Sequence, residues 1–262
     1  MTSAHSPAGA PDPTTRFSDR VEHYVRSRPP YPPAFFDLFR DRLGLSPGAA
    51  IADVGAGTGI SAGPLVERGY VVYAVEPNGP MRAAAERQLA HFPNFRSIAA
   101  AAEATTLPDA SVYAVLAAQA FHWFDRPRAR AEFARILRPG GSAVIVWNER
   151  RLDATPFLSE YESLLGRFGT DYGRVRHENI DDAALAAFFA PATYESLRFD
   201  NAQHFDYPGF ESRLLSSSYT PAEDDPRRAP MLADLRRLFD HHQQGGRVTF
   251  AYDTRAYVGR IA

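Results

Sequence analysis

The stretch Asp53-Val54-Gly55-Ala56-Gly57-Thr58-Gly59 decides the fold of this 262-residue chain. A short apolar run, residues 49–52, precedes it, and residues 61–68 can form a helix after it. The order of strand, glycine-rich turn and helix is typical of a loop that holds a nucleotide-like cofactor against bare backbone. Glycines allow positive φ angles and have no Cβ that would hold a ligand away. We expect Ser61 to cap the helix, since the N–H groups of a first turn lack intrahelical partners.

The acidic residue ahead of the glycines indicates which ligand this turn accepts. The spacing is G-x-G-x-G, whereas a dinucleotide-binding turn has G-x-G-x-x-G and holds a diphosphate. Asp53 would repel a diphosphate but would attract the sulfonium and ammonium groups of S-adenosylmethionine. Glu76, 21 residues after Gly55, ends the next predicted strand. An acid there is expected to accept hydrogen bonds from both ribose hydroxyls.

The rest of the chain alternates predicted strands with predicted helices. Strands are expected at residues 51–54, 71–75, 95–101, 112–118 and 142–148, and helices at 61–68, 80–91 and 127–136. This alternation predicts βαβ units and a parallel sheet. Upstream, helices are expected at 17–28 and 34–43, joined by the extended proline segment 29–33. Downstream, we expect helices at 157–168, 182–189, 210–218 and 231–243, weak alternation over 193–205, and a final strand at 248–259.

Composition excludes several classes of protein. The formal charge is −2 with no basic block, which argues against nucleic acid as the main partner. The chain has no cysteine, and therefore no disulfide framework or cysteine metal site. No apolar run approaches the ~20 residues that span a bilayer, and the N-terminus lacks the apolar stretch of a signal peptide. We expect a cytoplasmic protein without a metal, with residues 1–15 as a disordered tail.

Further motifs occur at intervals along the first half of the chain. An Ala-Glu pair, Ala102-Glu103, follows the third predicted strand, and residues 119–124 (QAFHWF) end the fourth. A Leu-x-Pro-Gly-Gly turn, residues 137–141, precedes the fifth. With these motifs the chain resembles the class I S-adenosylmethionine-dependent methyltransferases, above all their bacterial small-molecule, type 11-like branch. The resemblance covers residues 16–148, with a weaker echo near residues 252–260.

The resemblance implies a doubly wound, mostly parallel, seven-stranded α/β sheet that closes with an antiparallel strand. We expect one methyltransferase domain over residues 16–262. Within it, N-terminal lid helices occupy 16–48, the cofactor-binding half 49–150, a lid insert 151–192, and the end of the sheet with further helices 193–262. The N-terminal segment is expected to close over the cofactor.

The resemblance also assigns candidate site residues. The expected cofactor-binding residues are Tyr24, Arg28, Tyr31, Asp53, Gly55, Gly57, Thr58, Gly59, Glu76, Pro77, Met81, Ala102, Glu103, Gln119, Ala120 and Phe121. The expected substrate-binding residues are His122, Trp123, Asn148, Ser218, Tyr219 and Tyr252. The candidate catalytic residues are His122 and Tyr24; His122 is proposed because histidine titrates near neutral pH. Structural roles, such as packing or capping, remain open for each of these side chains.

The acceptor of the methyl group is less well defined by the sequence. We expect a small molecule, in particular an aromatic or heteroaromatic secondary metabolite, methylated on carbon, oxygen or nitrogen. The aromatic content of 12% fits such an acceptor, although core packing explains it equally well. The alternatives are an NAD(P)-dependent oxidoreductase and a catalytically silent S-adenosylmethionine-binding regulatory protein. The oligomeric state, monomer or homodimer, stays open.

Overall fold

The computed structural model describes residues 28–170, 182–217 and 219–261. Its centre is a seven-stranded sheet with the strand order β3-β2-β1-β4-β5-β7-β6. The strands are β1 (Ala50–Val54), β2 (Val71–Val75), β3 (Phe95–Ile98), β4 (Val112–Ala118), β5 (Leu137–Arg150), β6 (Tyr194–Phe205) and β7 (Val248–Gly259). Strands β1 to β5 pair in parallel, whereas β7 runs antiparallel to both of its neighbours. The predicted mostly parallel sheet with an antiparallel closing strand is therefore confirmed.

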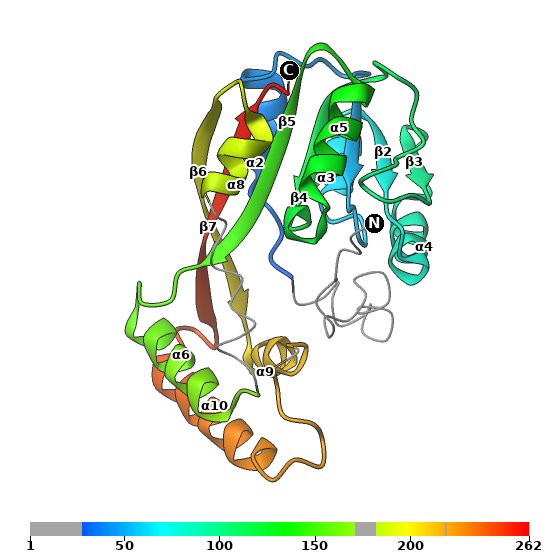
Figure 1. The fold of residues 1–262 in the computed structure, drawn as a ribbon. Coiled ribbons are helices and arrows are strands. Elements are labelled where there is room, and N and C mark those ends of the chain that lie inside the picture. The colour runs from blue at the N-terminus through cyan, green and yellow to red at the C-terminus, as the bar shows by residue number, and fades with distance from the viewer. Residues whose placement is uncertain (1–27, 171–181, 218, 262) are drawn as a thin grey trace, which may run out of the picture.

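Helices cover both faces of the sheet because its central strands are apolar on both sides. In β1, Ile51 packs into one core, while Ala52 and Val54 pack into the other. The first core holds α2 (Pro33–Asp41) and α3 (Ala62–Glu67), and α4 (Gly79–Leu89) adds its last residue to it. The second core holds α5 (Arg126–Ile136) and α8 (Asp182–Phe189). This is the doubly wound arrangement, and Figure 1 shows its layers.

Three helices form a separate group at the far end of the longest strands. They are α6 (Pro156–Phe168), α9 (Tyr207–Leu215) and α10 (Arg228–His242), and Figure 1 shows them below the sheet. Their core includes Tyr161 and Phe210 from the helices and Phe250 from the start of β7. The expected insert, residues 151–192, is thus divided: α6 packs in this group, whereas α8 packs against the sheet.

Most expected elements occur within a few residues of their predicted bounds. β5 is longer than expected because it begins in the Pro-Gly-Gly turn at Leu137, and β3 is shorter, ending at Ile98. The expected helix over residues 17–28 and the expected tail lie outside the described residues, except for Arg28. None of the described helices has both the length and the apolar character that crossing a bilayer requires.

Candidate functional site

The glycine turn after β1 has three residues with positive φ, which a side chain would strain. Gly55, Gly57 and Gly59 have φ values of +73°, +56° and +85°. A Cβ at Gly55 would lie 2.5 Å from the Cβ of Ala120, so only glycine lets the loop after β4 come this close. A Cβ at Gly57 would meet nothing nearer than the Met81 sulfur at 3.9 Å. Gly57 therefore faces room in which a ligand can approach the backbone.

Glu76, at the end of β2, holds this turn in place. Its Oε2 accepts a hydrogen bond from Gly57 N at 2.9 Å, and its Oε1 accepts one from Asn78 N at 2.8 Å. Asn78 in turn caps α4 through a bond from Met81 N at 3.0 Å. Burial raises the pKa of Glu76, while the two backbone N–H groups favour its charged form. Each carboxylate oxygen keeps a second lone pair with which to accept a ligand hydroxyl.

Asp53 lies beneath the same turn and is fully buried. Ser61 Oγ donates a 2.7 Å hydrogen bond to its Oδ2, while Oδ1 has no hydrogen-bond partner. Ser61 occupies the N-cap position of α3, as expected, but its hydroxyl donates to Asp53 and makes no capping bond to the helix. Burial raises the pKa of Asp53 to about 7, and the neighbouring Glu76 charge adds to the rise. Among the described residues, no cation pairs with the charged form of this buried acid.

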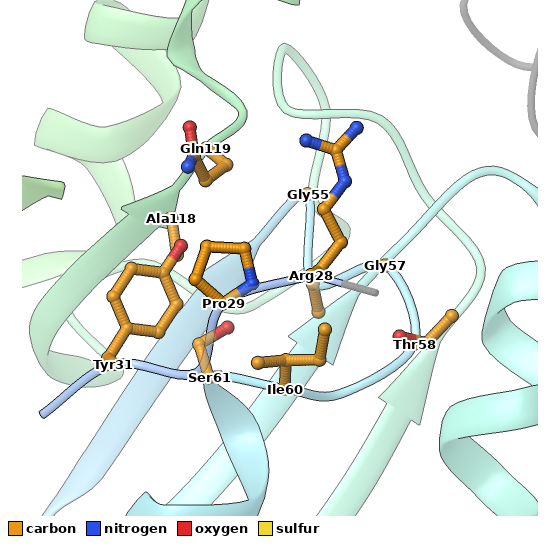
Figure 2. Close-up of a pocket in the computed structure, with 11 residues that line it drawn as sticks. Arg28, Pro29, Tyr31, Gly55, Gly57, Thr58, Ile60, Ser61, Ala118 and Gln119 are labelled. Carbon is orange, nitrogen blue, oxygen red and sulfur yellow. The ribbon is translucent and has the colours of Figure 1, made fainter. Parts of the chain in front are cut away.

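A pocket opens at the carboxyl edge of the sheet, directly over the glycine turn. It encloses about 400 Å³, counting the space at its mouth. In the view of Figure 2, Pro29 and Arg28 of the N-terminal segment lie between Gln119 and the turn residues Gly57 and Thr58. The lining residues are Arg28, Pro29, Tyr31, Gly55, Ala56, Gly57, Thr58, Ile60, Ser61, Ala118 and Gln119. The buried Oγ1 of Thr58, which lines the pocket, has no hydrogen-bond partner, whereas the equally unpartnered Oδ1 of Asp53 lies beneath the turn and outside the pocket lining.

The N-terminal segment is held over the pocket by side chains from the antiparallel end of the sheet. Asn148 Nδ2 donates to Pro29 O at 3.1 Å, and Asn201 Nδ2 donates to Pro30 O at 2.7 Å. Thr254 donates to Asn148 Oδ1, which fixes the orientation of that amide. Gln119, which has a positive φ of 56°, reaches Asn148 O at 3.3 Å. These contacts tie the pocket to the last strands of the sheet.

Residues 52–145, which contain the glycine turn, Glu76 and the loop after β4, match a protein-family model described as a methyltransferase domain. The matched segment, 94 of the chain's 262 residues, is similar to that domain.

Curated relatives of this chain are described as methyltransferases, and a solved structure shares its fold. An uncharacterized methyltransferase of Mycobacterium tuberculosis is 41% identical over 160 residues, which cover 60% of this chain and 62% of that protein. An uncharacterized methyltransferase-like protein of Schizosaccharomyces pombe is 33% identical over 156 residues, 59% of each chain. The matches thus span about three fifths of these relatives. The fold resembles a structure described as a type II methyltransferase of Anaeromyxobacter dehalogenans, with a TM-score of 0.62, 24% identity, and coverage of 89% of this chain and 98% of that one.

The fold brings many of the expected cofactor residues together at the pocket, and places others apart from it. Arg28, Tyr31, Gly55, Gly57, Thr58 and Gln119 line the pocket. Pro77 is exposed, and Ala102 is buried. Glu103 Oε1 accepts a 2.8 Å hydrogen bond from Asp125 N, at the start of α5. Phe121 is buried and packs against Trp147 and Phe188 in the second core.

The expected catalytic and substrate residues fall into separate places. His122 is exposed on the short helix Phe121–Trp123, with its ring against Trp123. Tyr252 is buried in the core of the three-helix group, and its hydroxyl donates to Gln203 at 2.9 Å. Tyr219 packs on that core too. Tyr24 and Ser218 lie outside the described residues.

Several residues that line the pocket were not predicted to bind the cofactor, namely Pro29, Ala56, Ile60, Ser61 and Ala118. Ala56 and Ile60 are carried into it by the glycine turn that was predicted. Ser61 follows the turn, but its position was interpreted as a helix cap. Pro29 lies between two residues that were predicted, Arg28 and Tyr31, so their spacing was the available clue.

Proposed function

We propose that this protein transfers a methyl group from S-adenosylmethionine to a small-molecule acceptor. The observation that carries the proposal is the buried Asp53 carboxylate under the glycine turn, which has one oxygen without a partner and a pKa of about 7. Such a group is stabilised by a cation and destabilised by a phosphate. S-adenosylmethionine brings two cationic groups to the site and no phosphate.

The residues present fit this cofactor. Glu76 retains lone pairs toward the ribose hydroxyls while holding Gly57 N, and the lack of a Cβ at Gly57 leaves the backbone open to the ligand. Arg28 borders the pocket and suits the methionine carboxylate, because guanidinium binds carboxylates through paired hydrogen bonds. When bound, S-adenosylmethionine supplies an electrophilic methyl group on its sulfonium.

The chain therefore has to bind the cofactor and the acceptor, orient them toward each other, and exclude water from the site. Proximity of the nucleophile to the methyl carbon can supply up to about 7–11 kcal/mol of the barrier reduction. Arg28, Pro29 and Tyr31 lie over the turn and cover part of the site from solvent. We propose a small acceptor, an aromatic or heteroaromatic secondary metabolite, which enters beside Gln119. His122 is proposed as the base that removes the proton from that acceptor.

The proposal is tested by turnover. The protein is incubated with S-adenosylmethionine and a panel of aromatic acceptors, and the release of S-adenosylhomocysteine is measured by mass spectrometry. The expected result is acceptor-dependent release in the wild type and its loss in Asp53→Asn. Asp153→Asn is the matched control, because this acid is exposed on the segment after β5. Failure to bind S-adenosylhomocysteine, together with tight binding of NAD, would overturn the proposal in favour of an oxidoreductase.

A further inference from the structure

The side-chain amide of Asn148, near the end of β5, uses all of its hydrogen-bonding positions within the protein. Its Nδ2 donates to the carbonyl oxygens of Pro29 at 3.1 Å and Pro30 at 3.4 Å. Its Oδ1 accepts from the Thr254 hydroxyl and from Asn201 Nδ2, the latter at 3.1 Å. A carboxamide offers two donor hydrogens and two acceptor lone pairs, so direct substrate binding by this amide would break at least one of these bonds.

Asn201 on β6 makes a second attachment to the same segment. Its Nδ2 donates to Pro30 O at 2.7 Å as well as to Asn148. The strand register places Asn148 opposite Thr254 of β7, and Asn201 opposite Tyr252, two residues earlier on β7. Residues two apart on a strand share a face, as do residues opposite each other on paired strands. Asn148, Thr254 and Asn201 therefore form one polar cluster, here called the anchor cluster, on one face of three adjacent strands.

The segment that the anchor cluster holds is residues 28–31, here called the strap. Pro29 and Pro30 have no backbone N–H, so at these two positions the strap can only accept hydrogen bonds. Its carbonyls need donors from other parts of the chain, and an asparagine amide provides two donor hydrogens on a short side chain. The anchor cluster supplies these donors from β5 and β6.

Aromatic packing fixes the downstream end of the strap. Tyr31 is buried, and the centre of its ring lies 5.4 Å from that of Phe35 and 6.2 Å from that of Phe36, both on α2. The Phe35 ring in turn lies 6.1 Å from Phe199, two residues before Asn201 on β6. The strap is therefore attached to α2 at one end and to the anchor cluster in its middle.

Arg28, the first residue of the strap, lines the pocket together with residues of the glycine turn, as Figure 2 shows. It directly precedes Pro29, whose carbonyl Asn148 holds. A binding group that is already held in place loses less conformational freedom when a ligand arrives, and the ligand is then bound more tightly. The anchor cluster is thus placed to set how well Arg28 is preorganised over the turn.

We infer that Asn201 and Asn148 are positioning residues for cofactor binding, which act by holding the strap, and with it Arg28, over the glycine turn. This inference rests on the proposed function. It adds that the antiparallel end of the sheet determines how tightly S-adenosylmethionine is held, through two side chains that bind the strap instead of the cofactor.

The test replaces each asparagine by aspartate, which has the same shape but no donor hydrogens. Calorimetric titration of the full chain with S-adenosylhomocysteine should show about tenfold weaker binding in Asn201→Asp and in Asn148→Asp. Asn94→Asp is the matched control, because Asn94 Nδ2 also donates to two carbonyls, those of Val66 at 2.9 Å and Tyr70 at 2.6 Å. Asn94 does not line the pocket, so its variant should bind S-adenosylhomocysteine like the wild type.

Two further variants test the route of the effect. If Asn201 acts through Arg28, Asn201→Asp should weaken binding by a much smaller factor in an Arg28→Ala background than in the wild type. Thr254→Val keeps both asparagines but removes the hydroxyl that orients the Asn148 amide. It should therefore weaken binding in the same direction, and it provides a measurement if the aspartate variants do not fold.

The outcomes separate the two proposals. If S-adenosylhomocysteine does not bind the wild type, the proposed function fails, and this inference fails with it. If it binds the wild type, but Asn201→Asp or Thr254→Val binds as tightly as Asn94→Asp, the positioning role is overturned while the proposed function stands. A lower unfolding midpoint in Asn201→Asp with unchanged affinity would make Asn201 structural. Equal factors in the wild-type and Arg28→Ala backgrounds would overturn the action through Arg28.

Discussion

Replacing Asp53 by asparagine should change how the stability of the protein depends on pH. The pKa of this carboxyl is about 7 in the folded chain and 3.8 ordinarily, so the folded state binds more protons between these values. The contribution of this carboxyl to the free energy of unfolding is therefore fully present below pH 3.8 and is lost as the pH rises through 7. Between pH 5 and pH 8 this one group should remove about 3 kcal/mol of unfolding free energy. Asp53→Asn, which cannot ionise, should lack that decrease.

The assay is urea unfolding of the ligand-free protein at pH 5, 6, 7 and 8. The difference in unfolding free energy between wild type and Asp53→Asn should move by about 3 kcal/mol in favour of the variant across this range. Asp153→Asn removes an exposed acid and should follow the wild type. Ser61→Ala removes the hydrogen bond that lowers the pKa of Asp53, so its loss of stability should centre at a higher pH.

Ionisation of the Asp53 carboxyl should also make cofactor binding depend on pH. A cationic ligand favours ionised Asp53, so the dissociation constant of S-adenosylhomocysteine should fall about tenfold between pH 6 and pH 8. In Asp53→Asn the affinity should be weaker and nearly independent of pH. A parallel pH slope in wild type and Asp53→Asn, in either experiment, would refute the reasoning.

Three further predictions concern the turn and the sheet. Gly55→Ala and Gly140→Ala both place a side chain at positive φ, but only the Cβ at Gly55 also clashes, at 2.5 Å from the Cβ of Ala120. Thermal unfolding should therefore show a loss of stability of about 1 kcal/mol for Gly140→Ala and a several-fold larger loss for Gly55→Ala. Glu76→Ala leaves two backbone N–H groups without acceptors, whereas Glu76→Gln leaves only one. Calorimetry should therefore show that the alanine variant binds S-adenosylhomocysteine more weakly than the glutamine variant. Equal affinities would exclude Glu76 as the ribose ligand. The hydrogen bond from Arg135 lowers the pKa of Glu132 to about 2, so Glu132 should stabilise the fold above pH 4.5 and lose this effect as the pH falls toward 2. The free energy of unfolding of Glu132→Gln should therefore fall less steeply with decreasing pH than that of the wild type.

Local patterns in the sequence predict most of the sheet and the glycine turn. Alternating strands and helices, and a glycine turn flanked by Asp53 and Glu76, are determined by neighbours in the chain. The sequence placed Ser61 correctly at the N-cap of α3, but did not reveal that its hydroxyl donates to Asp53, because that bond depends on how the turn folds back.

Contacts between distant segments were not predictable in the same way. The core of α6, α9 and α10 joins α6, which ends at Phe168, to two helices that begin only at Tyr207 and Arg228, and no spacing in the sequence encodes their pairing. The bond from Asn148 to Pro29, 119 residues away, is of the same kind.

The central claim is that the pocket over the glycine turn holds S-adenosylmethionine. Isothermal titration of the wild-type protein with S-adenosylhomocysteine and, separately, with NAD tests it most directly. The account predicts one site for S-adenosylhomocysteine per chain and no measurable binding of NAD, because Asp53 and the G-x-G-x-G spacing disfavour a diphosphate. Tight binding of NAD with none of S-adenosylhomocysteine would contradict it.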